Sequence, residues 1–156
     1  MTATTKAAAG ECSVVTVERR LAAVIRAVVP MPDIPKTERT LRAKLDAAIA
    51  TLDVGPLGNA FTLWHPPVDG RLDMQPGILV SRTFAPAVGE VLSSALPAGR
   101  AAHLLLVGPY DGLPAAWGRL FGWCAEQRLA LAGINWQVYA EDDPAQPETS
   151  LYALLA

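Results

Sequence analysis

Charge of either sign is scarce in this sequence. Its 156 residues carry 13 Lys and Arg against 15 Asp and Glu, so the formal net charge is only −2 at pH 7. Without a strong positive field, the chain has no electrostatic basis for holding a nucleic acid. The 12 residues before the first expected strand are also too few for a helix-turn-helix segment. We therefore expect no direct nucleic-acid binding.

Cysteine and histidine are nearly absent, with two residues of each. Cys12 and Cys124 have no metal-type spacing, and two cysteines do not form the dense disulfide framework of a small secreted domain. His65 and His103 are not accompanied by further ligands at a suitable spacing. No serine stands in the context of a nucleophile elbow. We expect neither a metal nor any other cofactor.

Long apolar runs are missing too. The longest, around residues 21–29 and 101–107, are too short to span a bilayer. The beginning of the chain has no continuous apolar segment of the kind that a signal peptide needs. The sequence therefore predicts a soluble cytoplasmic protein without membrane association, in which residues 1–12 are a frayed N-terminus.

What the sequence does have is apolar content of 51%, enough for a substantial core. Apolar residues at helical spacing predict two helices, over 37–52 with Thr37 as the cap, and over 113–129. The adjacent residues Pro66 and Pro67 are expected to end the strand before them. Segments rich in β-branched and aromatic residues predict strands at residues 13–17, 21–29, 60–65, 72–82, 100–107, 135–139 and 150–156.

The two halves of the sequence show a faint internal repeat. "VVPMPD" (28–33) matches "LVGPYD" (106–111), and "GNAFTLW" (58–64) matches "GINWQVY" (133–139) at an offset of 75 residues. A unit that cannot bury its sheet face alone would pair with its twin. We predict an α+β fold in which duplicated β-α-β-β units form one mostly antiparallel sheet, with two helices on one face and a central ligand groove. The half-units are expected at about 13–82 and 100–156.

One predicted strand places an uncharged amide between large aromatic residues. In the segment "NWQVYAEDDP", Gln137 and Tyr139 share one face of the strand, whereas Trp136 lies on the other. Phe61 and Trp64 are three residues apart in the first half, as are Trp136 and Tyr139 in the second. One member of each pair can therefore belong to the core while the other faces the groove. The residues alone leave open whether this strand is core or pocket wall.

The run from "VGPYDG" to "INWQVYAEDDPAQPE" resembles the GyrI-like, or AraC-type effector-binding, domain, and the resemblance extends over residues 14–155. It implies one domain over 13–156, with a small-molecule pocket between two paired half-units. In that family such domains bind drug-like compounds, often cationic and apolar. Stand-alone copies sequester compounds or protect against toxins, and some hydrolyse cyclopropane-containing toxins with glutamates. The matching positions are Gly108, Tyr110, Leu120, Trp123, Gly133, Gln137, Tyr139, Asp143 and Pro144.

The sequence departs from the family at the strand position that is commonly Glu, which is Gln137 here. The corresponding first-half positions, Thr62 and Gln75, are neutral as well. An amide donates and accepts hydrogen bonds but supplies no charge and no general acid or base. The resemblance and this departure together imply a stand-alone protein that holds a neutral apolar or aromatic compound, for sensing or sequestration. The candidate ligand-binding residues are Phe61, Trp64, Tyr110, Trp136, Gln137 and Tyr139.

Two alternatives stay open, and no catalytic residue is assigned. A hydrolase of a reactive small molecule would need an acid elsewhere, and Glu90, Asp73 and Glu141 are the available residues. An interaction protein would use the groove or a sheet edge against a partner such as gyrase. The sequence does not determine the oligomeric state, and a homodimer is one of the alternatives.

Overall fold

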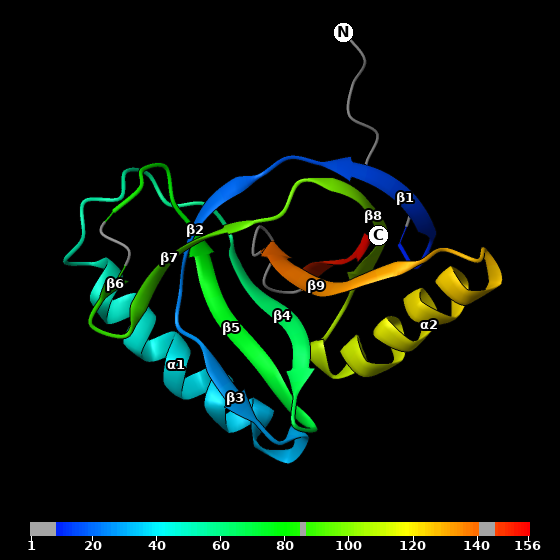
Figure 1. The fold of residues 1–156 in the computed structure, drawn as a ribbon, viewed down its shortest axis with the longest axis horizontal. Coiled ribbons are helices and arrows are strands. Elements are labelled where there is room, and N and C mark those ends of the chain that lie inside the picture. Colours follow the sequence, from blue (N-terminus) through cyan, green and yellow to red (C-terminus); the bar gives the residue numbers. More distant parts are fainter. Residues whose placement is uncertain (1–8, 85–86, 141–145) are drawn as a thin grey trace, which may run out of the picture.

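A computed structural model describes residues 9–84, 87–140 and 146–156 of the chain. Within these ranges ten strands form one antiparallel sheet, and two α-helices, α1 (Ile34–Ile49) and α2 (Leu113–Glu126), pack on it (Figure 1). The predicted fold class is confirmed. The expected frayed N-terminus lies largely outside the described residues, as does most of the loop that follows Tyr139.

The order of the strands shows the duplication directly. The sheet runs β1-β8-β10-β9-β4-β5-β2-β7-β6, with β3 paired to β5. One unit is β2-α1-β4-β5 and its twin is β8-α2-β9-β10, and the two units join where β4 pairs with β9. The strands are β1 (Cys12–Val17), β2 (Arg20–Val24), β3 (Ala27–Val29), β4 (Ala60–Val68), β5 (Arg71–Leu79), β6 (Ala87–Val88), β7 (Val91–Leu96), β8 (Gly99–Val107), β9 (Leu131–Ala140) and β10 (Glu148–Leu155).

Prolines interrupt the secondary structure less than the sequence suggests. Helix α1 begins at Ile34, three residues before the predicted Thr37, because Pro35 fits the first turn, where its missing N–H needs no partner. Strand β4 continues through Pro66 and Pro67 with an irregular register. Both prolines lie beyond the last residue that pairs with β9, so neither has to donate a hydrogen bond to that strand.

A long antiparallel ribbon closes the sheet on itself. Strands β1 and β2 pair with β8 and β7 in one continuous register, with Val17 opposite Gly99 and Arg20 opposite Leu96. Because β1 lies at one end of the strand order and β2 near the other, the ribbon connects the two ends. Figure 1 shows the resulting curl, with both helices on its outside.

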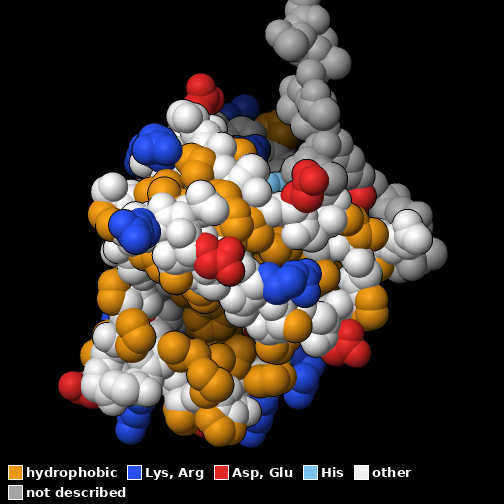
Figure 2. All heavy atoms as spheres, turned by 90° about the vertical axis from the view of Figure 1, so that its right-hand side faces the viewer, with side chains coloured by type: hydrophobic (Ala, Val, Ile, Leu, Met, Phe, Trp, Pro, Cys, Tyr) orange, Lys and Arg blue, Asp and Glu red, His pale blue; other side chains and the backbone are white. Residues whose placement is uncertain are grey.

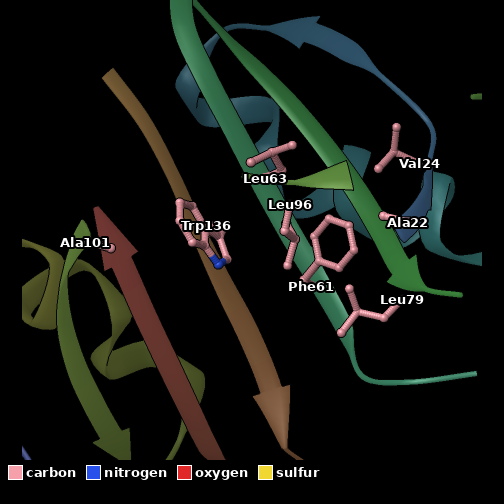
Figure 3. Close-up of a cluster of buried hydrophobic side chains, with 8 residues drawn as sticks. All are labelled: Ala22, Val24, Phe61, Leu63, Leu79, Leu96, Ala101 and Trp136. Atoms are coloured by element: carbon pink, nitrogen blue, oxygen red, sulfur yellow. The ribbon is translucent and has the colours of Figure 1, made fainter. Parts of the chain in front are cut away.

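The two faces of the curled sheet have separate cores. We call the face that carries the helices the outer face and the opposite one the inner face. On the inner face Phe61 and Leu63 of β4 and Trp136 of β9 lie in one buried cluster (Figure 3). On the outer face α1 buries Leu41, Leu45 and Ile49, and α2 buries Ala116, Leu120 and Cys124. Burial of these apolar side chains stabilises the packing of both helices on the sheet. The sheet residues that lie between the two helices are therefore not needed for that packing.

We expect a buried histidine to make the stability of this fold dependent on pH. His103 on β8 is 7% exposed and its ring lies 4.9 Å from that of Tyr152. Burial lowers the pKa of His103 below its ordinary value of 6.5, because the imidazolium would lose its hydration. Above the unfolded-state pKa, His103 is neutral in both states and the free energy of unfolding is at its full value. As the pH falls, the unfolded state binds a proton more readily than the folded state, so the free energy of unfolding decreases.

We expect the urea midpoint to fall more steeply between about pH 7 and about pH 5 in the native protein than in His103→Gln. Unfolding followed by circular dichroism at each pH measures this slope. Equal slopes in the two proteins would show that another group titrates.

Candidate functional site

The join between the two units is a short antiparallel pairing at the centre of the sheet. The facing pairs are Phe61 with Val138, Thr62 with Gln137, Leu63 with Trp136, and Trp64 with Asn135. The repeat offset of 75 residues takes Thr62 to Gln137, which is also its cross-strand partner. The pseudo-two-fold axis between the units therefore passes between these two side chains.

Five side chains of the join and of the residue that follows it along β9 point to the outer face, between the helices. Side chains alternate along a strand, so Thr62 and Trp64 of β4 lie opposite in direction to the inner-face residue Leu63. In the same way Asn135, Gln137 and Tyr139 of β9 lie on the outer face. Figure 1 shows α1 and α2 on either side of β4 and β9, diverging toward their C-terminal ends. Residues from both helices therefore border this face.

A chain of side-chain hydrogen bonds crosses the outer face from α2 to α1. Trp117 Nε1 donates to Gln137 Oε1 at 2.9 Å, and Gln137 Nε2 donates to the Tyr139 hydroxyl at 2.8 Å. That hydroxyl lies 2.7 Å from Thr62 Oγ1, which donates to Glu38 Oε2 at 3.2 Å. We call these five side chains the relay. The relay ties both helices to the join through polar contacts.

The chemistry of its two ends fixes the direction of every bond in the relay. An indole N–H can only donate, and a carboxylate can only accept. Because the Thr62 hydroxyl gives its proton to Glu38, the hydroxyl of Tyr139 must donate to Thr62. All donors therefore point from α2 toward α1, and the Gln137 amide has one orientation.

The carboxylate at the end of the relay is paired with a cation. Glu38 Oε1 lies 2.8 Å from Arg42 Nη2, one helical turn further along α1. Arg42 also donates to the backbone carbonyls of Gly77 at 2.6 Å and Phe61 at 2.7 Å, and its guanidinium lies 6.0 Å from the centre of the Tyr139 ring. The relay and Arg42 together carry no net charge when Glu38 is ionised.

The environment of the relay keeps Tyr139 protonated. Burial raises the pKa of the Tyr139 hydroxyl above its ordinary value of 10, and the nearby charge of Glu38 adds to the effect. Hydrogen bonds from Gln137 and Thr62 and the charge of Arg42 oppose this shift without reversing it. At neutral pH the group is therefore the neutral phenol that the relay requires as a donor.

Aromatic rings surround the relay on the α2 side. Tyr110 meets Tyr139 edge-on with ring centroids 5.6 Å apart, and Trp117 stacks on Phe121 at 5.4 Å. Tyr110 is 45% exposed and Phe121 is 36% exposed, so part of each ring faces solvent. Seen from the α2 side, the surface has a hollow bordered mainly by hydrophobic side chains (Figure 2). Rings in this position offer flat apolar area to a ligand.

The structure divides the predicted ligand-binding residues into two groups. Trp64, Gln137 and Tyr139 lie on the outer face, and Tyr110 contacts Tyr139. Phe61 and Trp136 are 0% and 2% exposed and belong to the inner core (Figure 3). This is the division between core and groove that the three-residue spacing allows.

The acids considered for a hydrolase do not meet at the join. Asp73 is buried and pairs with Arg26 at 2.9 Å, and Glu90 is exposed and pairs with Lys44 at 3.3 Å. Glu141 lies outside the described residues. The carboxylate that does reach the join is Glu38, which the sequence reading missed. The sequence feature that could have indicated it is the i, i+4 spacing of Glu38 and Arg42, on the side of the helix that also carries the buried Leu45 and Ile49.

Within the described ranges, two depressions that open to solvent adjoin α1, and neither of these lies over the join. One of about 390 Å³ is at the C-terminal end of the helix, and one of about 250 Å³ is near its N-terminal end. The predicted central groove therefore stays a prediction. Among the described residues no three His, Cys, Asp or Glu side chains are grouped to hold a metal. No helix within those ranges is long and apolar enough to cross a bilayer.

Comparison with known proteins gives both a family match and structural matches. The model of the GyrI-like small molecule binding domain matches residues 10–155. A search of curated proteins gave no match.

Three of the solved structures that share the fold illustrate the match. EcmrR in a DNA complex within EcmrR-RPo aligns with a TM-score of 0.77 and 19% identity, over 93% of this chain and 57% of that one. The EcmrR C-terminal domain gives 0.70 and 19% over 94% and 97%, respectively. SAV2435 bound to tetraphenylphosphonium gives 0.67 and 11% over 94% of each chain. At these identities the likeness concerns the fold alone, and this chain spans little more than half of the longer EcmrR chain.

Proposed function

This chain belongs to the family of GyrI-like small molecule binding domains, and we propose that it binds a neutral apolar or aromatic compound on the outer face of the β4–β9 join. The observation that carries the proposal is the relay, in which the polar group of β9 at the centre of the join is the Gln137 amide rather than a carboxylate. The role would be to sense or sequester the compound rather than to transform it.

The amide has hydrogen-bonding capacity left for a ligand. An amide group has two N–H donors and two oxygen lone pairs. Within the described part of the chain, Gln137 uses one donor toward Tyr139 and one lone pair toward Trp117. One N–H and one lone pair remain, so a ligand with a single acceptor or donor atom can be oriented there. The rings of Trp64, Tyr110 and Tyr139 would supply the apolar contact area.

The charge balance of the site favours a neutral ligand. SAV2435 has been solved with tetraphenylphosphonium, a cation. In the present chain Glu38 is already paired with Arg42 and accepts a hydrogen bond from Thr62. A cationic ligand would find no unpaired carboxylate in the relay to offset its loss of hydration. The same pairing holds Glu38 away from a role as general base, which supports binding over hydrolysis.

Fluorescence titration with two ligands of similar shape tests this proposal. Triphenylphosphine oxide is neutral and carries one acceptor oxygen, whereas tetraphenylphosphonium is a cation without one. We expect triphenylphosphine oxide to quench tryptophan emission and to bind more tightly than the cation. Tyr110→Ala should weaken its binding about threefold to tenfold, through loss of one aromatic contact.

Trp136→Phe is the matched control, because residue 136 lies in the inner core. Its affinity for triphenylphosphine oxide should equal that of the native protein. Equal or tighter binding of the cation, or no response to either compound, would contradict the proposal.

A further inference from the structure

The larger cavity lies at the C-terminal end of α1 and takes no part in the relay. Its volume of about 390 Å³ falls within the range of small-molecule pockets. Its lining is apolar apart from one carboxylate and the backbone. The lining residues are Asp46, Ile49, Ala50, Leu52, Val54, Gly55, Leu57 and Ile78.

The carboxylate in the lining has no counter-ion. Among the described residues, no ion pair or side-chain hydrogen bond engages Asp46. Arg42 lies one turn before it on α1, but its guanidinium is held by Glu38 and by two backbone carbonyls of the sheet. Nearby, Asp53 is paired with Arg82 at 2.7 Å, so that pair adds no net charge. Asp46 is exposed, so it places at the solvent-facing rim of the cavity one negative charge that no cation within the described ranges pairs.

The helix itself adds to this negative potential. Helix α1 ends at Ile49, and Ile49 and Ala50 both line the cavity. The C-terminal end of a helix carries a partial negative charge, which stabilises cations within the last turn. The acidic side chain and the helix end thus act in the same direction on one apolar cavity.

This cavity is separate from the proposed ligand face. The relay contacts α1 through Glu38, in the N-terminal half of the helix, whereas the cavity begins at Asp46. In Figure 1 the C-terminal end of α1, in cyan, points away from α2. A ligand in the cavity would therefore not touch Trp117 or the α2 side of the relay.

We infer that the cavity is a second binding site, for a small lipophilic ammonium compound. Its hydrocarbon part would lie against Ile49, Leu52 and Ile78, and its ammonium group would pair with Asp46. The proposed function does not depend on this site, since the first site selects neutral compounds and this one selects cations.

Methyl NMR with a matched pair of probes tests the inference. Cyclohexylammonium and cyclohexanol share the same ring and differ in charge. We expect cyclohexylammonium to shift the methyl signals of Ile49, Leu57 and Ile78 in a saturable way. Asp46→Asn should weaken its binding about threefold to fivefold, as expected for one partly exposed ion pair, and should leave cyclohexanol unaffected. Added salt should weaken the binding of cyclohexylammonium in the native protein as well.

Two further variants separate this site from its surroundings. Asp53→Asn combined with Arg82→Gln removes a nearby ion pair without changing the net charge, and Tyr110→Ala alters the proposed ligand face. Neither change should alter the affinity for cyclohexylammonium. The inference is overturned if these methyl signals do not move. It is also overturned if Asp46→Asn binds the cation as well as the native protein, or if the shifts gather around Trp117 and Tyr139 instead.

Discussion

Phe61→Ala is expected to lower the free energy of unfolding by about 3 to 5 kcal/mol, the usual cost of removing a fully buried phenylalanine. Its ring is 0% exposed and lies in the inner core between β4 and its neighbours (Figure 3). On β5 it lies directly over Gly77, where an added Cβ would come 2.4 Å from Cζ of the ring and 2.7 Å from Cγ1 of Val24. The absence of a side chain at Gly77 is therefore what makes room for the ring.

This contact can be measured by combining two substitutions. Gly77→Ala alone should destabilise the fold by about 1 to 3 kcal/mol or more through overpacking. In the Phe61→Ala background the ring is gone, so the added methyl should cost less, and the two effects should fall short of additivity. Urea unfolding of the four proteins gives the coupling energy.

An exposed site on the edge of the sheet serves as the control. Val88→Ala, at a residue that is 40% exposed on β6, should change stability by no more than about 0.5 kcal/mol. Strict additivity of the changes at positions 61 and 77 would contradict the close approach of Phe61 to Gly77.

Gln137→Glu is expected to convert the ligand preference from neutral compounds to cations. The new carboxylate could accept the Trp117 N–H, but it could no longer donate to Tyr139. It would lie in a site where the native amide is only 7% exposed, separated from Glu38 by Tyr139 and Thr62 in the relay. An unpaired buried charge costs stability, here about 3 to 5 kcal/mol, and a cationic ligand would offset that cost.

Binding and unfolding measurements together test this reversal. We expect tetraphenylphosphonium to bind at least about tenfold more tightly to Gln137→Glu than to the native protein, equivalent to about 1.4 kcal/mol. Triphenylphosphine oxide should bind more weakly. Stability should recover in the presence of the cation, since a ligand stabilises the state that it binds.

Gln137→Met separates the effect of the added charge from the effect of losing the hydrogen bonds of the relay. It removes both hydrogen bonds of Gln137 while keeping the size of the side chain and adding no charge. Its stability should fall, but its affinity for tetraphenylphosphonium should not rise. A similar gain in cation affinity in both variants would show that the identity of the group at 137 does not set the charge preference.

The short matched segments of the sequence were enough to predict the fold, because each matched pair adopts the same secondary structure in the two units. The matched segments "VVPMPD" and "LVGPYD" both lead through a short 3₁₀ turn into a helix, and "GNAFTLW" and "GINWQVY" become the paired strands β4 and β9. The curl of the sheet was not predictable in the same way. It depends on β1 pairing with β8 and β2 with β7 over a separation of some 80 residues, and no short-range pattern encodes that pairing.

The proposed site was only half visible in the sequence. Alternation along the strand placed Gln137 and Tyr139 together, because strand periodicity is a local property. The contribution of α1 was missed because Glu38 and Arg42 have the spacing of an ordinary surface ion pair. Their importance comes from the position of the helix over Thr62, which is a feature of tertiary packing.

The two units meet at Thr62 and Gln137, and the difference between these residues has a geometric consequence. A binding site built from two identical units would bind a flat molecule equally well after the molecule is rotated by a half-turn about the pseudo-two-fold axis. Here a short hydroxyl faces a longer amide across the axis, and Trp64 in one half corresponds to Tyr139 in the other. The half-turn is no longer equivalent, so a molecule seated over this centre has one preferred pose instead of two.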